Sequence, residues 1–130
     1  MKFKKSLILA GFTVVLLTFP TISLADKASV KIEAPVSAEK NAEIIIKIHV
    51  RHKGNNFLHY TNWVEVKING KTVQRWEFSA RNRPENEAFT KEIRYTIAEQ
   101  LTITAEANCN LHGSEGPATE RVLLVPVENG

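Results

Sequence analysis

Alternation of apolar and polar residues runs through most of this chain and constrains its fold more than any other feature. Ile44, Ile46, Ile48 and Val50 fall on one side of their run, as a strand with one buried face requires. Apolar residues at helical spacing are nearly absent. The pattern therefore predicts strands that bury one face and expose the other.

The strongest local signal is a hairpin centred on Asn69-Gly70. Val64, Val66 and Ile68 alternate with polar residues before this dipeptide, and a second run, 73–78, returns after it. Asn-Gly is the dipeptide that a two-residue hairpin turn prefers, because both positions tolerate a left-handed backbone. Two antiparallel neighbours are therefore predicted here.

Further short strands bring the total to about seven. The polar segment 81–87, which contains a proline, reads as a surface loop between strands. Short strands at regular spacing, separated by turn signals, favour an all-β fold, an immunoglobulin-like antiparallel β-sandwich. The remaining predicted strands lie around residues 30–32, 89–97, 101–107 and 120–127.

The first 25 residues have a different character. Three lysines precede an apolar run, 6–25, that contains no charged residue. A basic start, an apolar middle and small residues at the end are typical of a cleaved secretory signal peptide. We therefore expect a signal peptide over 1–25, a mature domain over 26–130, and export to the periplasm or the extracellular space. Because a run of this length also spans a bilayer, a retained membrane anchor is the alternative.

The charge of the mature segment excludes one class of partner. The whole chain has 17 Lys and Arg against 14 Asp and Glu, with a pI near 9.1. Three of those cations lie in the first five residues, and every acidic residue lies in 26–130, which therefore holds 14 charges of each sign. A neutral domain lacks the basic surface that nucleic acid requires, so no nucleic-acid partner is expected.

Metal-binding residue types are concentrated in two segments. His49, His52 and His59 fall within eleven positions, and Cys109 and His112 stand three apart at the end of a predicted strand. Imidazole and thiolate ligands suit zinc, copper and iron. Cys109 is the only cysteine, so an internal disulfide is excluded, and its thiol is buried, paired between chains or bound to a metal.

Two of these segments resemble a known family. Residues 52–66, HKGNNFLHYTNWVEV, and 109–113, CNLHG, resemble the iron-binding domain of the superoxide reductases, the neelaredoxins and desulfoferrodoxins. Both motifs stand in the family's order. The second motif is the more specific one, because it matches the family pattern at five positions, including both metal ligands.

The resemblance implies a mononuclear non-haem iron site that reduces superoxide to hydrogen peroxide. His52, His59 and His112 would lie in a plane around the iron, with the Cys109 thiolate on the axis and superoxide binding opposite to it. An unidentified electron-donor protein would supply the electron. Tyr60 and Trp63 would support the loop and shield the site.

The family's fourth planar histidine is missing from this chain. It belongs to a Glu-Lys-His triplet, for which residues 26–28 offer Asp-Lys-Ala. Lys27, in the family lysine's place, would attract superoxide by its charge. His49 is a candidate replacement, although alternation puts it on the face opposite His52. The other candidates are a water, a side chain of a second copy in a homo-oligomer, or the α-amino group of Asp26.

The incomplete ligand set leaves other readings open. A site with three histidines and a cysteine also suits zinc or copper, and such a protein would bind metal or transfer electrons without full reductase activity. A weaker resemblance links residues 34–47, followed by His52 and the later hairpin, to the small sandwich subunit of the sulfur-oxidation carrier complex. That likeness implies a metal-free module that binds a partner protein.

Overall fold

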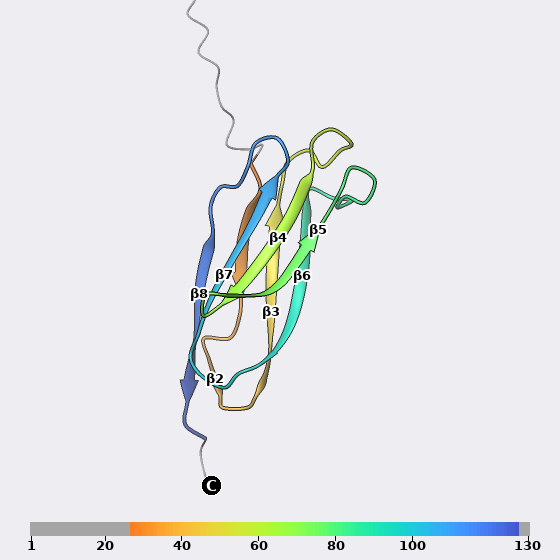
Figure 1. Ribbon diagram of the computed structural model, residues 1–130. Helices are drawn as coiled ribbons and strands as arrows, with labels where there is room; N and C mark the ends of the chain where they lie inside the picture. The colour runs from red at the N-terminus through yellow and green to blue at the C-terminus, as the bar shows by residue number, and fades with distance from the viewer. Residues whose placement is uncertain (1–26, 128–130) are drawn as a thin grey trace, which may run out of the picture.

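The computed structural model describes residues 27–127, which form two β-sheets packed face to face (Figure 1). One sheet has three strands in the order β1-β3-β6, and the other has five in the order β2-β8-β7-β4-β5. The predicted all-β, immunoglobulin-like sandwich is confirmed. The strands are β1 (Ser29–Glu33), β2 (Ser37–Glu39), β3 (Glu43–Arg51), β4 (Thr61–Ile68), β5 (Lys71–Glu77), β6 (Ala88–Thr96), β7 (Leu101–Cys109) and β8 (Ala118–Val125).

The predicted signal peptide lies outside the described residues. Among residues 27–127, no helix is long and apolar enough to cross a membrane.

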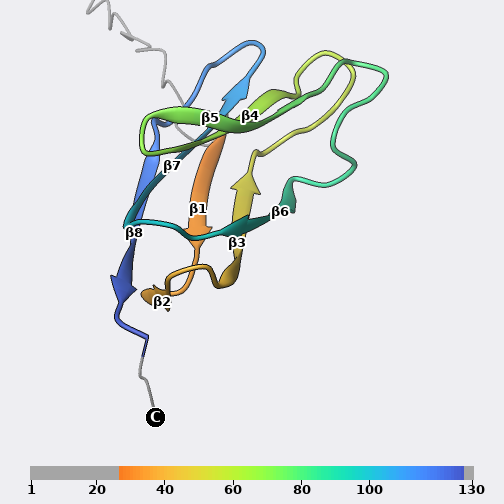
Figure 2. The same cartoon turned by 60° about the horizontal axis from the view of Figure 1, so that its bottom comes forward.

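The core lies between the two sheets and follows the alternation of the sequence. In β3, Ile46 and Ile48 are fully buried, whereas Ile45, between the buried Ile44 and Ile46, lies on the other face and is 40% exposed. Val64 of β4 and Ile103 of β7 are also fully buried and face this row from the other sheet. Figure 2 shows β1, β3 and β6 on one side of this layer and β4, β5, β7 and β8 on the other.

The hairpin predicted at Asn69-Gly70 is confirmed. Ile68 at the end of β4 pairs with Lys71 at the start of β5, which leaves Asn69 and Gly70 as a two-residue loop. Their φ angles are 50° and 82°, so both residues adopt the left-handed backbone that matches the twist of a tight hairpin.

One strand was not predicted, and it adds a parallel pair to an otherwise antiparallel sandwich. β2 has only three residues and pairs in parallel with the end of β8, Ser37 beside Leu123. A strand this short has no room for a readable alternation. The structure therefore has eight strands rather than about seven.

Three strand ends meet at one end of the sandwich. β3 ends at Arg51, β4 begins at Thr61 and β7 ends at Cys109. Thr61 pairs directly with Cys109, and a register irregularity follows between Thr61 and Trp63. Such bulges often stand beside functional sites, since they redirect a side chain at the edge of a regular ladder.

The buried row of β3 should dominate the stability of the fold. Replacing Ile46 by Ala removes a fully buried side chain and leaves a cavity, so the free energy of unfolding should fall by about 2–5 kcal/mol. Ile45→Ala on the exposed face of the same strand is the matched control and should cost less than about 1 kcal/mol. Urea denaturation followed by circular dichroism measures both values, and equal losses would contradict this assignment of faces.

Candidate metal centre

Two loops at one end of the sandwich carry the predicted ligands. Residues 52–60 connect β3 to β4, and residues 110–117 connect β7 to β8. Both loops lie at the same end of the molecule in Figures 1 and 2. Residues that are more than 50 positions apart in the sequence therefore meet in space.

Four side chains of the predicted set converge here. The ligand atoms of His52, His59 and Cys109 all lie within 4.8 Å of one another. His59 Nε2 lies 3.1 Å from His52 Nε2 and 2.9 Å from His112 Nδ1. His112 Nδ1 is also 3.7 Å from Cys109 Sγ. Three imidazole nitrogens and one thiol sulfur thus form one connected cluster, in which His112 contacts His59 and Cys109.

The protons available cannot satisfy all these contacts. His59 Nε2 faces two imidazole nitrogens, and it carries either one in-plane proton or one in-plane lone pair. A single proton or lone pair cannot make two linear hydrogen bonds. A cation held by the three lone pairs resolves the conflict, so the donor set fits a metal ion.

The surroundings of His52 set its tautomer. Asn55 Oδ1 accepts hydrogen bonds from the Thr61 backbone N–H, at 2.8 Å, and from the Thr61 hydroxyl, at 3.1 Å, while Asn55 Nδ2 donates to the Asn86 carbonyl at 2.9 Å. Asn55 Oδ1 is therefore an acceptor, and His52 Nδ1, 2.8 Å away, must carry the proton. The neutral ring then has its lone pair on Nε2, the nitrogen that faces the cluster.

The first loop is held by its own backbone. Asn56 Oδ1 accepts hydrogen bonds from the backbone N–H groups of Leu58 and His59, both at 3.0 Å, and the Asn56 N–H donates to the His59 carbonyl. Gly54 adopts a φ of 96°, and a Cβ there would lie 3.2 Å from His59 Nδ1. A side chain at position 54 would therefore be strained and would crowd the His59 ring.

Asn110 joins the two loops. Its backbone N–H donates to the Tyr60 carbonyl at 3.0 Å, its Oδ1 accepts from the Tyr60 N–H at 2.9 Å, and its Nδ2 donates to the Leu58 carbonyl at 3.2 Å. These three bonds involve Leu58 and Tyr60, the residues that precede and follow His59 in the sequence. They hold the loop of His59 against the loop of Cys109 and His112.

Cys109 sits at the base of a tight turn. Cys109 and Gly113 exchange two backbone hydrogen bonds, at 2.9 and 3.0 Å, and Gly113 adopts a φ of 83° to close the turn. The turn brings the backbone N–H of His112 to 3.4 Å from Cys109 Sγ. The sulfur is buried, and this N–H points toward it.

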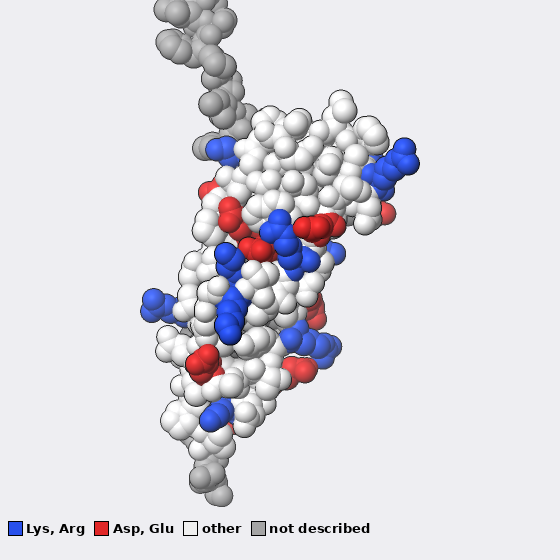
Figure 3. Space-filling model, viewed as in Figure 1, with Lys and Arg blue, Asp and Glu red and all other residues white. Residues whose placement is uncertain are grey.

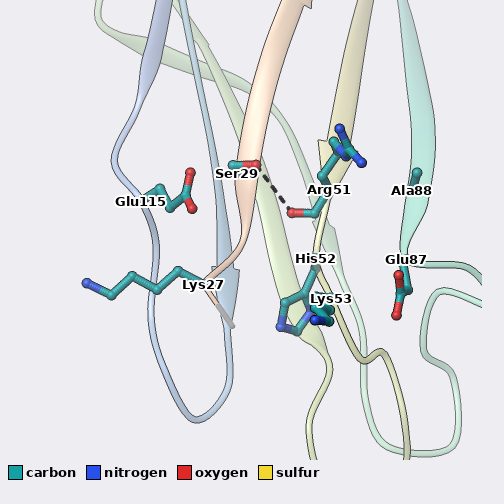
Figure 4. A pocket seen from close by; sticks show the side chains of 8 residues that line it. All are labelled: Lys27, Ser29, Arg51, His52, Lys53, Glu87, Ala88 and Glu115. Atoms are coloured by element: carbon teal, nitrogen blue, oxygen red, sulfur yellow. Dashed lines mark hydrogen bonds between the residues drawn. The ribbon is translucent and has the colours of Figure 1, made fainter. Parts of the chain in front are cut away.

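Lys27 lines a hollow beside the cluster. The hollow measures about 410 Å³, and it is bounded by His52 on one side and Glu115 on the other. Figure 4 shows the Lys27 side chain running from the start of the described chain toward the side of Glu115, away from the His52 ring. Arg51 and Lys53 add two further cations to the lining.

His49 does not join the cluster. Its Nε2 donates to Glu33 Oε2 at 2.7 Å, and its Nδ1 accepts from the Thr90 hydroxyl at 2.9 Å. These partners lie on β1 and β6, the strands on either side of β3 in the sheet. His49 therefore lies on the face of β3 that alternation predicts for it. The bond from His49 is the main cause that holds the pKa of Glu33 below its usual value, with Lys47 adding to it.

Ala28, which the sequence analysis aligned with the family's fourth histidine, lies next to the second loop. Its N–H donates to the Gly113 carbonyl at 3.3 Å, and its carbonyl accepts from the Glu115 N–H at 2.9 Å. Ala28 is fully buried. Two backbone hydrogen bonds therefore hold Ala28 beside Gly113, the residue that follows His112.

Tyr60 and Trp63 occupy different places. Tyr60 is half-buried and contributes the backbone contacts to Asn110. Trp63 lies beyond the bulge on β4, half-buried, with the Arg75 guanidinium 4.6 Å from its ring centre. The salt bridges of Arg75 with Glu65 and Glu77 hold it there and raise its pKa.

The supporting residues Asn55, Thr61 and Asn110 were not singled out from the sequence. Asn55 and Thr61 lie within the first motif, and Asn110 lies within CNLHG. Their position in these motifs, close to the predicted ligands, is the sequence signal by which they could have been found. Their hydrogen-bond partners are set by the fold, since Asn110 bonds to residues about 50 positions away.

Solved structures share this fold. A superoxide reductase (neelaredoxin) from Ignicoccus hospitalis is 21% identical, with a TM-score of 0.67 over 81% of this chain and 87% of that one. A putative superoxide reductase from Thermotoga maritima is 22% identical, with a TM-score of 0.57 over 75% and 86%. The sulfur carrier protein SoxY from Chlorobium limicola is 15% identical, with a TM-score of 0.53 over 74% and 78%.

The comparison of the sequence with known families decides to which of these groups the chain belongs. No curated protein matches the chain at a significant level. The desulfoferrodoxin family matches residues 21–114, a stretch that contains both predicted motifs and all four converging side chains. The chain therefore belongs to the desulfoferrodoxin family.

Proposed function

We propose that this chain is an exported non-haem iron protein that reduces superoxide to hydrogen peroxide. The observation that carries the proposal is the cluster of His52, His59 and Cys109, with His112 in contact with the last two, in a member of the desulfoferrodoxin family. The reaction adds one electron and two protons to each superoxide. Export is part of the proposal because a charge-free apolar run, 6–25, follows three lysines.

Iron is the proposed metal because the chain belongs to the desulfoferrodoxin family. Imidazole and thiolate ligands suit zinc and copper as well, so the metal content must be measured.

The residues of the chain would have separate roles in this reaction. A bound iron ion would supply the electron by passing from the ferrous to the ferric state, and the Cys109 thiolate would donate electron density toward it. Lys27, Arg51 and Lys53 line the hollow beside His52 and attract a small anion by their charge. The His112 N–H donates to Cys109 Sγ and would help to orient the sulfur toward a bound metal. Protons come from solvent, and a one-electron donor protein restores the electron.

Metal content and colour test the assignment of the ligands. The purified protein should contain about one iron per chain, and the oxidised form should absorb visible light by charge transfer from thiolate to iron. Cys109→Ala should abolish this band because it removes the sulfur. Lys40→Ala, on the exposed turn before β3, is the control and should keep the band. A colourless protein with an intact sandwich, or one that binds only zinc, would contradict the proposed cofactor.

Pulsed superoxide then tests the activity itself. The ferrous protein should be oxidised by a superoxide pulse much faster than superoxide disappears in buffer, and hydrogen peroxide should form in equal amount. An iron protein that shows the thiolate band but does not react with the pulse would support electron transfer alone and reject reductase activity.

The missing ligand can be restored if position 28 is correctly aligned. Ala28→His should place an imidazole beside Gly113 and strengthen iron binding by about tenfold or more, that is about 1.4 kcal/mol. Lys40→His adds the same type of ligand at an exposed, distant turn and should leave the affinity unchanged. Competition with a chelator measures both dissociation constants. An unchanged affinity in a folded Ala28→His variant would refute the alignment.

Asn55 should act on metal affinity through His52. Asn55→Leu removes the acceptor that holds the His52 proton on Nδ1, so iron should bind about 10- to 100-fold more weakly. Asn55→Asp keeps an accepting oxygen and should lose less. Nitrogen NMR of the metal-free wild type provides a second measurement, since His52 should carry its proton on Nδ1. A proton on Nε2, or equal affinity losses in the two variants, would contradict this role.

A further inference from the structure

A group of exposed apolar side chains lies at the end of the sandwich opposite the ligand loops. β8 leaves the sandwich at this end, and β2 runs beside it (Figures 1 and 2). The five side chains are between 36% and 79% exposed, and we call them the apolar end: Val36, Leu123, Leu124, Val125 and Val127. Apolar side chains that are grouped, rather than scattered singly, indicate an interaction surface.

β8 also has an open strand edge at the apolar end. Its ladder with β7 ends at the pair of Val122 and Leu101, whereas β8 continues to Val125. On the other edge, the Leu123 N–H donates to the Val36 carbonyl at 3.0 Å. Successive residues of a strand direct their backbone groups to opposite edges, so the N–H and the carbonyl of Leu124 point toward the edge beyond the end of β7. Such an edge is a template for a further strand.

The long edge strands of the sandwich are protected by charge, and the end of β8 is not. β5 is one edge of its sheet and carries Lys71 and Arg75, and β6 is an edge of the other sheet and carries Lys91 and Arg94. Charged side chains on an edge oppose pairing with another chain. Residues 122–127, VLLVPV, contain no charged residue. The end of β8 is therefore an edge that nothing in its own sequence keeps from pairing.

The charges of the chain favour a second copy over a charged partner. An acidic protein, a basic protein or an anionic membrane would meet no complementary charge on residues 122–127. Residues 26–130 hold 14 charges of each sign, and Figure 3 shows the two signs mixed over one face of the molecule. Two copies therefore approach each other without net repulsion, and an uncharged apolar strand is complementary to itself.

From these observations we infer that a second copy of this chain docks on the apolar end and forms a two-fold symmetric dimer. The two β8 ends lie antiparallel across the symmetry axis, so the Leu124 N–H of each copy donates to the Leu124 carbonyl of the other. Pro126 has no N–H and ends the pairing. The ligand loops lie at the far ends of such a dimer and stay uncovered, so the inference does not rest on the proposed function (Figure 1).

Sedimentation equilibrium of the metal-free protein tests the inference. Five side chains cover less than the about 800 Å² per partner of a standard interface, so the measurement extends from about 1 μM to about 1 mM protein. The average mass should rise from one chain to two over this range. Hydrogen exchange provides a second measurement, since the Leu124 amide should exchange more slowly in the dimer than in the monomer.

Lysine substitutions locate the interface. Leu123→Lys should raise the dissociation constant of the dimer about tenfold or more, because it places two like charges near the symmetry axis. Val36→Lys should act in the same direction, and its 79% exposed side chain allows the change without loss of folding. Val73→Lys is the matched control, since Val73 is 39% exposed on β5 of the same sheet. Leu111→Lys, on the second ligand loop, should also leave the dimer unchanged.

Several results would overturn the inference. A monomer at the highest concentration would do so, as would a dimer that folded Leu123→Lys and Val36→Lys variants leave unchanged. A dimer that Val73→Lys or Leu111→Lys disrupts would place the interface elsewhere. A monomeric protein that sediments with phosphatidylcholine vesicles, and loses this binding in Leu123→Lys, would make lipid the occupant of the apolar end. None of these measurements requires iron, so a failure to bind iron would not affect them.

Discussion

The pairing of β4 with β7 fixes the distance between the two loops that carry the histidines and the cysteine. Thr61 opens β4 directly opposite Cys109, which ends β7. The buried faces of both strands pack into the core, so a slip of one residue would turn the apolar rows of Val64 and Ile103 toward solvent. The core therefore specifies the register, and the register brings the cysteine to the base of the histidine loop.

Backbone groups and amide side chains then set the orientation of the ligands. Asn55 fixes the tautomer of His52, Asn56 shapes the turn before His59, and Asn110 ties that turn to the second loop. Each of these amides offers both a donor and an acceptor, which lets it join two chain segments without introducing a charge next to the site. Loops held in this way keep the imidazoles of His52 and His112 each in contact with His59, an arrangement that costs conformational entropy when the chain folds.

The β-sandwich and the cluster of histidines and cysteine could both be predicted from the sequence, but for different reasons. Burial of alternate residues is a local rule, so β3 and the Asn69-Gly70 hairpin follow from it directly. His52, His59, Cys109 and His112 were found through two short motifs, because no local rule brings residues 52 and 112 together. β2 escaped prediction because three residues are too few to show an alternation. The roles of Asn55 and Asn110 depend on partners that only the folded chain brings near.

The two sides of the cluster differ in chemistry. Ala28 is a buried core residue whose backbone pairs beside Gly113, and the neighbouring Lys27 lines the hollow next to His52. Leu58, Leu111 and His112 are exposed on the two loops instead. Because a small anion responds to charge and a protein surface to apolar area, the hollow and the loops differ in the kind of ligand that each would attract.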